Sequence, residues 1–326
     1  MKTKLHFITR SLLLLPGQVC VWTYFWAKYW LVEKPRRQPP KLYHGHSQPT
    51  GLWCICAIYQ PKRVSPNLIA YLACLRDAGY NVIAVHNGKG APDLVEALTP
   101  FCHTVMLRSP GGRDFGSYRE GTLYLNELTA GEDIRQVAYC NDSLFIKPSA
   151  LAAMMAQIRE MPDDYIGAIE THERRYHVQS WFFGVSGNVF HAGYFQQFWS
   201  NYIPTSHRGR NMKRSELGLS QYLMKHNLYP RIIYPIHWML HRILSIQETE
   251  LPRRLILLSP ASKHYRLYPD LQNVFTAFGY EHPASSGTTP EEKALPLGLR
   301  LMIERSLFDI SDGNPMSAIP GDQESP

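Results

Sequence analysis

The triplet Asn141-Asp142-Ser143 directly follows an apolar run that is typical of a buried strand. Oxygen ligands such as the Asp142 carboxylate bind Mg²⁺ or Mn²⁺, and a cation held there would in turn bind a diphosphate. The same three residue types are common in turns, so a helix-capping turn is the alternative interpretation. We expect Asp142 to bind the divalent cation or the diphosphate, with Asn141 and Ser143 beside it.

A glycine-rich segment, GGRDFGSY at residues 111–118, joins a turn to the predicted start of a helix. Backbone N–H groups at a helix start and the guanidinium of Arg113 are both suited to bind phosphate oxygens. Asp114 is expected in the same site, with capping of the helix and pairing with Arg113 as the structural alternative. The segment matches neither a Walker loop nor the dinucleotide-binding pattern G-x-G-x-x-G.

Further polar residues are candidates for binding a sugar and for proton transfer. His177 and Gln179 precede the apolar run WFFGV and would bind sugar hydroxyls or form structural hydrogen bonds. Glu216 opens a predicted helix, where the helix dipole favours a carboxylate. If Glu216 faces a crevice, it would instead act as a general base on an acceptor hydroxyl. Glu170, at the end of another predicted strand, is a candidate substrate-binding residue.

The scaffold for these side chains is predicted from the hydrophobic pattern, which alternates strands and helices. Predicted strands cover residues 52–59, 81–88, 103–109, 136–143, 165–173, 177–190 and 231–240. Predicted helices cover residues 66–77, 91–98, 114–128, 149–161, 195–202 and 215–227. This order predicts an α/β fold with a mostly parallel central sheet flanked by helices. Ligands bind such sheets beyond the carboxyl ends of the strands, which adds Tyr59 and Asn87 to the candidate site.

The hydrophobic segment at residues 1–33 is predicted to associate with a membrane. Residues 11–32 carry aromatic side chains at three- and four-residue spacing, with basic residues on both sides. Trp and Tyr favour the headgroup level, so a helix lying in the interface explains this pattern, and a single span is the alternative. We predict a Pro-rich basic linker at 34–50, a folded domain at 51–245, a C-terminal extension at 246–308 and a disordered tail at 309–326.

The net charge of +7 is concentrated at the N-terminus. Residues 1–37 contain seven Lys or Arg and one Glu, whereas the rest of the chain contains 27 basic and 26 acidic residues. A nucleic-acid-binding protein spreads Lys and Arg over its folded surface, so we expect no nucleic-acid partner and instead an anionic lipid surface. The six cysteines include no C-x-x-C pair, which argues against a zinc site or a disulfide framework and favours a reducing compartment.

Three segments together resemble the rhamnan synthesis protein F family: GGRDFGSYREG, YCNDSLF, and HVQSWFFGVSGNVF followed by FQQFW. The resemblance extends over residues 50–240. It implies a glycosyltransferase-A-like architecture and the use of a nucleotide-sugar, with rhamnose or another deoxysugar as the donor, in cell-surface glycan synthesis.

The resemblance also implies roles for individual residues. Asp142 resembles the acidic residue that binds the metal or diphosphate, Tyr59 and Asn87 would flank the nucleotide, and Glu216 resembles the acceptor-side base of inverting enzymes. The chain differs from this pattern in having no D-x-D motif, and Ser215 stands where many such enzymes have a second acid beside the base.

We therefore expect an inverting glycosyltransferase, associated with the cytoplasmic face of the inner membrane through residues 11–32. It would transfer a sugar to a glycan or lipid-linked acceptor of a cell-surface polysaccharide or lipopolysaccharide. If transfer proceeds with retention, Glu170 replaces Glu216 as the carboxylate to test. The alternative is a non-catalytic assembly factor that docks other polysaccharide-assembly enzymes at the membrane, and a sugar-phosphate transferase is a third hypothesis.

Overall fold

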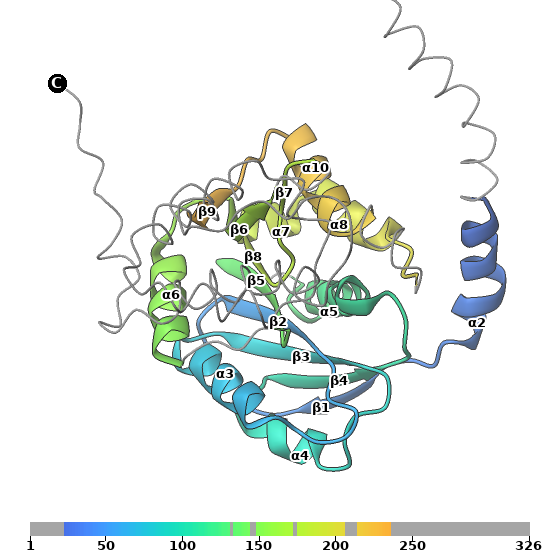
Figure 1. Ribbon diagram of the computed structural model, residues 1–326, viewed down its shortest axis with the longest axis horizontal. Helices are drawn as coiled ribbons and strands as arrows, with labels where there is room; N and C mark the ends of the chain where they lie inside the picture. The colour runs from blue at the N-terminus through green and yellow to red at the C-terminus, as the bar shows by residue number, and fades with distance from the viewer. Residues whose placement is uncertain (1–22, 131–132, 144–147, 172–174, 206–213, 236–326) are drawn as a thin grey trace, which may run out of the picture.

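A computed structural model describes residues 23–130, 133–143, 148–171, 175–205 and 214–235. Residues 11–22 of the predicted membrane segment, the predicted extension at 246–308 and the tail at 309–326 lie outside these ranges. The described residues form an α/β fold in which helices flank a mixed sheet with a parallel centre, as the sequence predicts (Figure 1).

The sheet has nine strands in the part of the chain that the structure describes. Their bounds are β1 Lys41–His44, β2 Leu52–Ile58, β3 Asn81–Asn87, β4 Thr104–Arg108, β5 Gln136–Asn141, β6 Tyr165–Thr171, β7 His177–Val178, β8 Phe182–Ser186 and β9 Arg231–Tyr234. The order is β1-β4-β3-β2-β5-β8-β6-β7, and β9 pairs with β6. Strands β4, β3, β2 and β5 run parallel, whereas β1 and β8 join them in the antiparallel direction.

Helices cover both faces of this sheet (Figure 1). Their bounds are α3 Pro66–Asp77, α4 Leu94–Leu98, α5 Arg113–Leu128, α6 Pro148–Glu160, α7 Gly187–His191, α8 Gly193–Asn201 and α10 Glu216–Lys225, with a 3-10 turn, η2, at Thr99–Phe101. Side chains of α3, α4 and α6 join one hydrophobic core, and side chains of α5, α7, α8 and α10 join the other. Because apolar residues are buried on both faces, β2 is an uninterrupted apolar run rather than an alternating one.

The structure changes two of the sequence-based boundaries. Residues 41–44 of the predicted linker form β1, which pairs with β4 at the edge of the sheet. The predicted strand at 177–190 is divided into β7, β8 and α7. The strand ends at Ser186 because its side chain caps α7, accepting a hydrogen bond from the Val189 backbone N–H at 3.3 Å.

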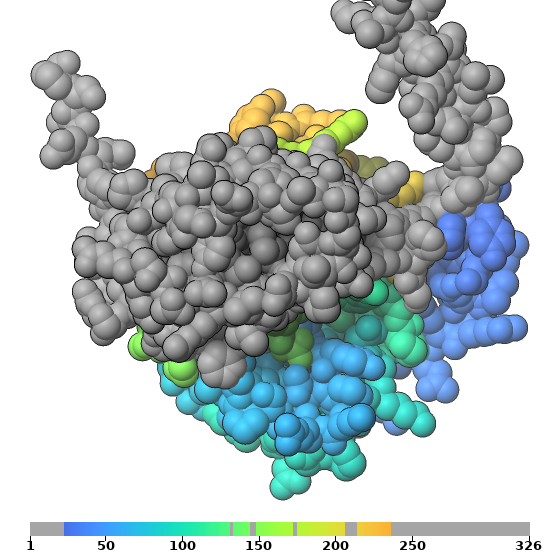
Figure 2. All heavy atoms as spheres, in the orientation of Figure 1, coloured from blue at the N-terminus to red at the C-terminus, as the bar shows by residue number. Residues whose placement is uncertain are grey.

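The N-terminal helix covers residues 23–36 and includes a π-helical segment, η1, at Lys28–Glu33, followed by α2 at Lys34–Arg36. Within the described residues, no helix combines the length and the apolar character needed to cross a membrane. Tyr29 is buried against the fold, whereas the side chains of Trp26 and Trp30 are exposed. In Figure 2 the blue atoms of this helix stand out at the right-hand edge of the view.

Candidate functional site

The candidate site lies where β2 and β5, two parallel neighbours, end side by side. The chain leaves β2 toward β3 on one side and leaves β5 toward β6 on the other, which makes this edge a switch point of the strand order. Beyond these ends, Asp142 Oδ2 accepts hydrogen bonds from the Tyr59 backbone N–H at 2.9 Å and from Gln60 Nε2 at 2.7 Å. The predicted strand-end residues Tyr59 and Asp142 are therefore in direct contact.

Asn141 connects this edge to the start of α5. Its Nδ2 donates a hydrogen bond to Asp114 Oδ2 at 3.0 Å, and its Oδ1 accepts one from the Ser143 backbone N–H at 3.1 Å. The turn before α5 requires Gly112, whose φ of 75° lies in the left-handed region that a side chain disfavours. The glycine-rich segment and the Asn141-Asp142-Ser143 triplet thus form one site.

Two carboxylates in this site act on the titration of a third. The pKa of Asp114 is raised from 3.8 to about 6, first by burial and then by the negative charges of Asp142 and Glu216. The hydrogen bond from Asn141 and the charge of Arg113 act in the opposite direction. Concentrated negative charge beyond the carboxyl ends of the strands is suited to holding protons and cationic or hydroxyl-bearing ligands.

The Asp114 carboxyl group has a raised pKa that can be measured directly. We expect carbon-detected NMR to give a pKa of about 6 for this carboxyl group, and we expect Asp142→Asn to lower that pKa because it removes the nearest negative charge. The folded protein holds this proton more tightly than the unfolded chain does. Its ionisation therefore lowers the free energy of unfolding as the pH rises from 3.8 to about 6.

Asp77→Asn is the matched control, since Asp77 is exposed and its hydrogen bonds go to the neighbouring Arg76. An Asp114 pKa that stays the same in the Asp142 variant would show that the two carboxylates do not interact.

Glu216 is the first residue of α10, the helix that packs against β7. The Ser180 hydroxyl donates a hydrogen bond to Glu216 Oε1, and His177 Nε2 lies 3.8 Å from Glu216 Oε2. Tyr118 Oη donates to the Ser180 backbone carbonyl at 2.7 Å, which fixes the turn between β7 and β8. His177 and Ser180 therefore orient the Glu216 carboxylate.

The His177 ring has a defined arrangement of protons. Its Nδ1 lies 2.8 Å from the Arg175 carbonyl oxygen, which can only accept a hydrogen bond. With Nδ1 protonated, Nε2 is a proton acceptor in the neutral ring and carries a second proton in the imidazolium. His177 can thus receive a proton on the nitrogen that faces Glu216.

Two functional candidates, Gln60 and His86, were missed by the sequence reasoning. Gln60 contacts Asp142, and its Oε1 accepts a hydrogen bond from the Ser65 backbone N–H at 3.1 Å. The His86 ring stacks on the Tyr59 ring with centroids 6.0 Å apart, and His86 Nε2 accepts a hydrogen bond from the Gln60 backbone N–H. Burial lowers the pKa of His86, which favours this neutral ring. The sequence signal that could have identified them was their position at the ends of β2 and β3, the strands that also end near Tyr59 and Asn87.

Asn87 and Arg113 occupy different positions at the glycine-rich segment. Asn87 Oδ1 accepts hydrogen bonds from Arg108 Nη1 at 2.8 Å and from the Gly111 backbone N–H at 3.1 Å. Asn87 therefore holds the glycine-rich segment in place through its side chain. Arg113 is exposed at the start of α5 and has a φ of 51°, which is uncommon for a residue other than glycine. Its guanidinium is open to solvent at the edge of the site.

Glu170 and Gln179 lie on the β6–β7 hairpin. Glu170 is opposite Val178 in the strand register, and the Gln179 backbone N–H donates to the Ile169 carbonyl at 2.9 Å. Burial raises the pKa of Tyr176, and the charge of Glu170 and a hydrogen bond with it raise that pKa further. Glu170 thus interacts with Tyr176, whereas the carboxylates that raise the pKa of Asp114 are Asp142 and Glu216.

The divalent cation expected on Asp142 remains a prediction. Within the described ranges, no three His, Cys, Asp or Glu residues are placed to hold a metal ion together. One oxygen of Asp142 already accepts two N–H hydrogen bonds. The mechanism proposed below therefore includes no step through a metal.

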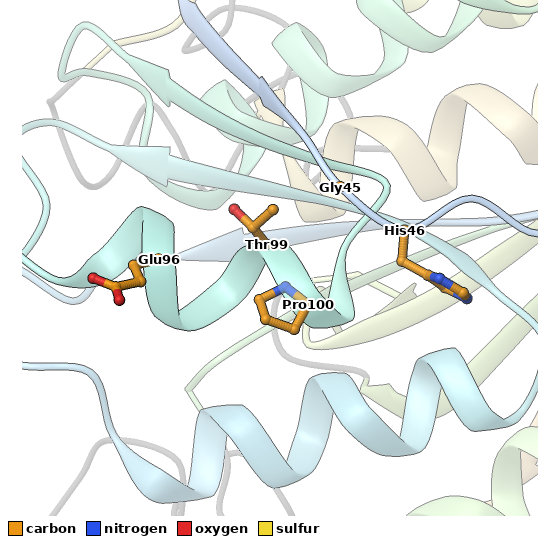
Figure 3. Close-up of a pocket in the computed structure, with 5 residues that line it drawn as sticks. All are labelled: Gly45, His46, Glu96, Thr99 and Pro100. Atoms are coloured by element: carbon orange, nitrogen blue, oxygen red, sulfur yellow. The ribbon is translucent and has the colours of Figure 1, made fainter.

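Two cavities lie elsewhere on the described surface. The larger, about 620 Å³, is lined by Gly45, His46, Glu96, Thr99 and Pro100. Figure 3 shows the side chains of Glu96 and His46 pointing in opposite directions, so they do not converge on a ligand. This cavity is near the beginning of β4, at the opposite end of the strands from Asp142.

The smaller cavity, about 430 Å³, lies beside the start of α10 and is closer to the candidate site. Its lining combines aromatic rings, amides and one arginine: Gln197, Phe198, Asn201, Tyr202, Ile203, Arg214, Gly218 and Tyr222. Arg214 and Gly218 each lie two residues from Glu216 in the sequence.

Comparison with known proteins gives two relatives of low identity, and no protein-family model matches the chain. The chain is 27% identical over 165 residues to an uncharacterized protein, y4gN, of Sinorhizobium fredii, which covers 49% of this chain and 42% of that protein. It is 28% identical over 165 residues to virulence protein VirA of Vibrio anguillarum, covering 50% and 52% of the two chains. The chain thus spans about half the length of the curated relatives it matches.

Proposed function

We propose that this protein is a glycosyltransferase with a glycosyltransferase-A-like fold, which transfers a sugar from a nucleotide-sugar to a hydroxyl group of a surface-glycan acceptor. One observation carries the proposal: Asp114, Asp142 and Glu216 gather beyond the carboxyl ends of parallel strands at a switch point, although they are far apart in the sequence. Transfer to a hydroxyl requires a positioned base, and Glu216 is a half-buried carboxylate with two orienting partners.

In this mechanism Glu216 removes the proton from the acceptor hydroxyl as that oxygen attacks the anomeric carbon of the donor. The Ser180 hydroxyl holds one carboxylate oxygen, which leaves the other on the side of His177. The bond between the anomeric carbon and the diphosphate breaks as the new glycosidic bond forms, and the nucleoside diphosphate leaves with its electron pair. Transfer by this route inverts the anomeric configuration.

The donor is expected across the ends of β2 and β3. Tyr59 is 62% exposed, and its ring is stacked on His86, so its outer face is available to a nucleobase. Arg113 has an exposed guanidinium at the edge of the site that would offset the charge of the diphosphate. The cavity beside α10, with its aromatic and amide side chains, is suited to the acceptor saccharide.

The proposal is tested by incubating the protein with a panel of nucleotide-sugars, including a deoxysugar donor, and a lipid-linked glycan acceptor. We expect release of the nucleoside diphosphate and a product extended by one sugar with inverted configuration, as measured by mass spectrometry and NMR. Phosphate retained in the product would instead indicate a sugar-phosphate transferase.

A non-catalytic assembly factor is the second candidate, because Asp142 and Glu216 already accept hydrogen bonds from within the fold. Calorimetry against the same nucleotide-sugars, with and without Mn²⁺, separates the two candidates. Binding of none of the donors would favour the assembly role and contradict the enzymatic proposal.

We further propose that the N-terminal helix lies on the cytoplasmic face of a membrane. Trp26, Trp30, Leu31 and Val32 are exposed on this helix, and Lys28, Lys34 and Arg36 add positive charge. The double variant Trp26→Ser/Trp30→Ser is expected to lower binding to anionic vesicles by on the order of tenfold, because two large apolar side chains no longer enter the interface. Sedimentation with vesicles measures this.

Tyr229→Ser is the matched control, since Tyr229 is also exposed but lies just before β9. Equal vesicle binding by the wild type and the double variant would rule out this helix as the membrane contact.

A further inference from the structure

Arg108, the last residue of β4, is a buried arginine that forms no ion pair with the residues that the structure describes. It is 4% exposed, and its Nη1 donates to Asn87 Oδ1 and to the Gly111 carbonyl, both at 2.8 Å. Its other two guanidinium nitrogens, Nε and Nη2, are buried and contact no hydrogen-bond acceptor in the described part of the chain. A buried charge with unused donors is costly unless a counter-charge completes it.

Two more arginines lie close to Arg108. Arg37 Nη1 is 3.7 Å from Glu120 Oε1, and Arg119 Nη1 is 3.1 Å from the same oxygen. The side chains of Arg37 and Arg119 are each 16% exposed, and that of Glu120 is 23% exposed. Burial, together with the charges of Arg37 and Arg119, lowers the pKa of Arg108 to about 10, whereas Glu120 and, less strongly, Tyr29 raise it. Two guanidinium groups therefore pair with one carboxylate, whose charge also acts on Arg108.

Glycines let these guanidinium groups approach the backbone closely. A Cβ atom on Gly111 would lie 2.9 Å from Arg37 Nη2, and one on Gly116 would lie 3.1 Å from both Nη atoms of Arg108. These two residues are part of the segment that the sequence analysis assigned to phosphate binding through Arg113. The arginines that approach the backbone of this segment closely are Arg37 and Arg108.

We propose that Arg37, Arg108 and Arg119 form a binding site for a phosphate group, distinct from the carboxylate cluster of Asp114, Asp142 and Glu216. The phosphate would accept hydrogen bonds from the partly exposed Arg37 and Arg119 and supply the negative charge that the cluster lacks. Glu120 occupies part of this site as an internal carboxylate that competes with the ligand. The proposal does not depend on glycosyltransferase activity.

The position of the site suggests two sources for the phosphate group. Arg37 directly follows the N-terminal helix, and its guanidinium lies over the ring of Tyr29 at 5.2 Å. A lipid headgroup would reach the cluster from a membrane on which this helix lies, whereas free phosphate or a soluble phosphate ester would reach it from solution. The chemistry of binding is the same in both cases.

The test is calorimetric titration of the full chain with inorganic phosphate, together with vesicle binding at equal charge density. Arg119→Gln is expected to weaken phosphate binding about tenfold or more, since it removes one charged donor. Glu120→Gln is expected to strengthen it severalfold, since it removes the competing carboxylate and keeps the shape. Arg135→Gln, at an exposed arginine far from the cluster, should leave the affinity unchanged.

These opposite signs separate a binding site from a structural ion-pair cluster. A purely structural cluster would lose stability in both variants and bind phosphate equally weakly in each, which would overturn the proposal. If Arg119→Gln fails to fold, the Glu120→Gln titration decides alone. If Arg119→Gln loses binding to phosphatidic acid vesicles, with phosphatidylcholine vesicles as the reference, the site binds a lipid headgroup. If vesicle binding is unchanged but phosphate binding is altered, the site binds a soluble phosphate.

Discussion

Replacing Glu216 with glutamine is expected to lower the rate of sugar transfer about 10²- to 10⁴-fold, the usual effect of removing a positioned base. Glutamine keeps the size and the hydrogen bond from the Ser180 hydroxyl but cannot take a proton from the acceptor. Donor affinity should change little, because the nucleotide is expected on the side of Tyr59. Steady-state kinetics with varied donor and acceptor concentrations would separate kcat from KM.

Glu160→Gln is the matched control, since Glu160 is an exposed glutamate at the end of α6, where it pairs with Arg135 and Arg159. A Glu216→Gln enzyme that keeps nearly all of its turnover would remove Glu216 from the mechanism. If the product also retained the configuration of the donor, Glu170 would become the carboxylate to replace.

Gly112→Ala is expected to destabilise the protein by about 2–4 kcal/mol, the largest effect on folding that we predict at the site. The φ of 75° is unfavourable for alanine, and the new Cβ would lie 2.5 Å from Pro204 Cβ and 2.9 Å from Gly116 Cα. Because Gly116 contributes backbone atoms of α5, the clash cannot be relieved by rotating a side chain. Urea unfolding would measure the loss.

Gly193→Ala provides the comparison for this variant. Gly193 begins α8, and a Cβ there would meet nothing within 4 Å. Its replacement should therefore leave the stability unchanged or raise it slightly. Equal free energies of unfolding for the two variants would mean that the turn before α5 tolerates a side chain.

The sequence was most informative where burial leaves a simple pattern. Strand β2 is apolar throughout because helices cover both of its faces, so it could be recognised without knowing its neighbours. Polar residues directly after such strands identified Tyr59 and Asp142, because the ends of parallel strands meet at one edge.

Contacts that depend on tertiary pairing could not be predicted. Ser180 reaches Glu216 only because β7 and β8 are separated by a turn, and that turn is absent from a pattern that reads 177–190 as one strand. Strand β1 lies in a Pro-rich segment and is exposed along its length, and its four residues show no alternation of apolar and polar side chains. The Arg37–Glu120 contact likewise joins residues that no local periodicity relates.

The N-terminal helix is held against the domain by several contacts close to its end. Arg37 contacts Glu120, the Gln38 backbone N–H donates to Ser109 Oγ, and β1 is paired with β4 only a few residues later. If this helix lies on a membrane, as proposed, these contacts would restrict the height and tilt of the domain above the bilayer, whereas a flexibly linked domain would turn freely. The three carboxylates would then stay at a nearly constant distance from the lipid surface. Proposed acceptors would be selected by how far they extend from that surface, before any contact with the protein selects among them.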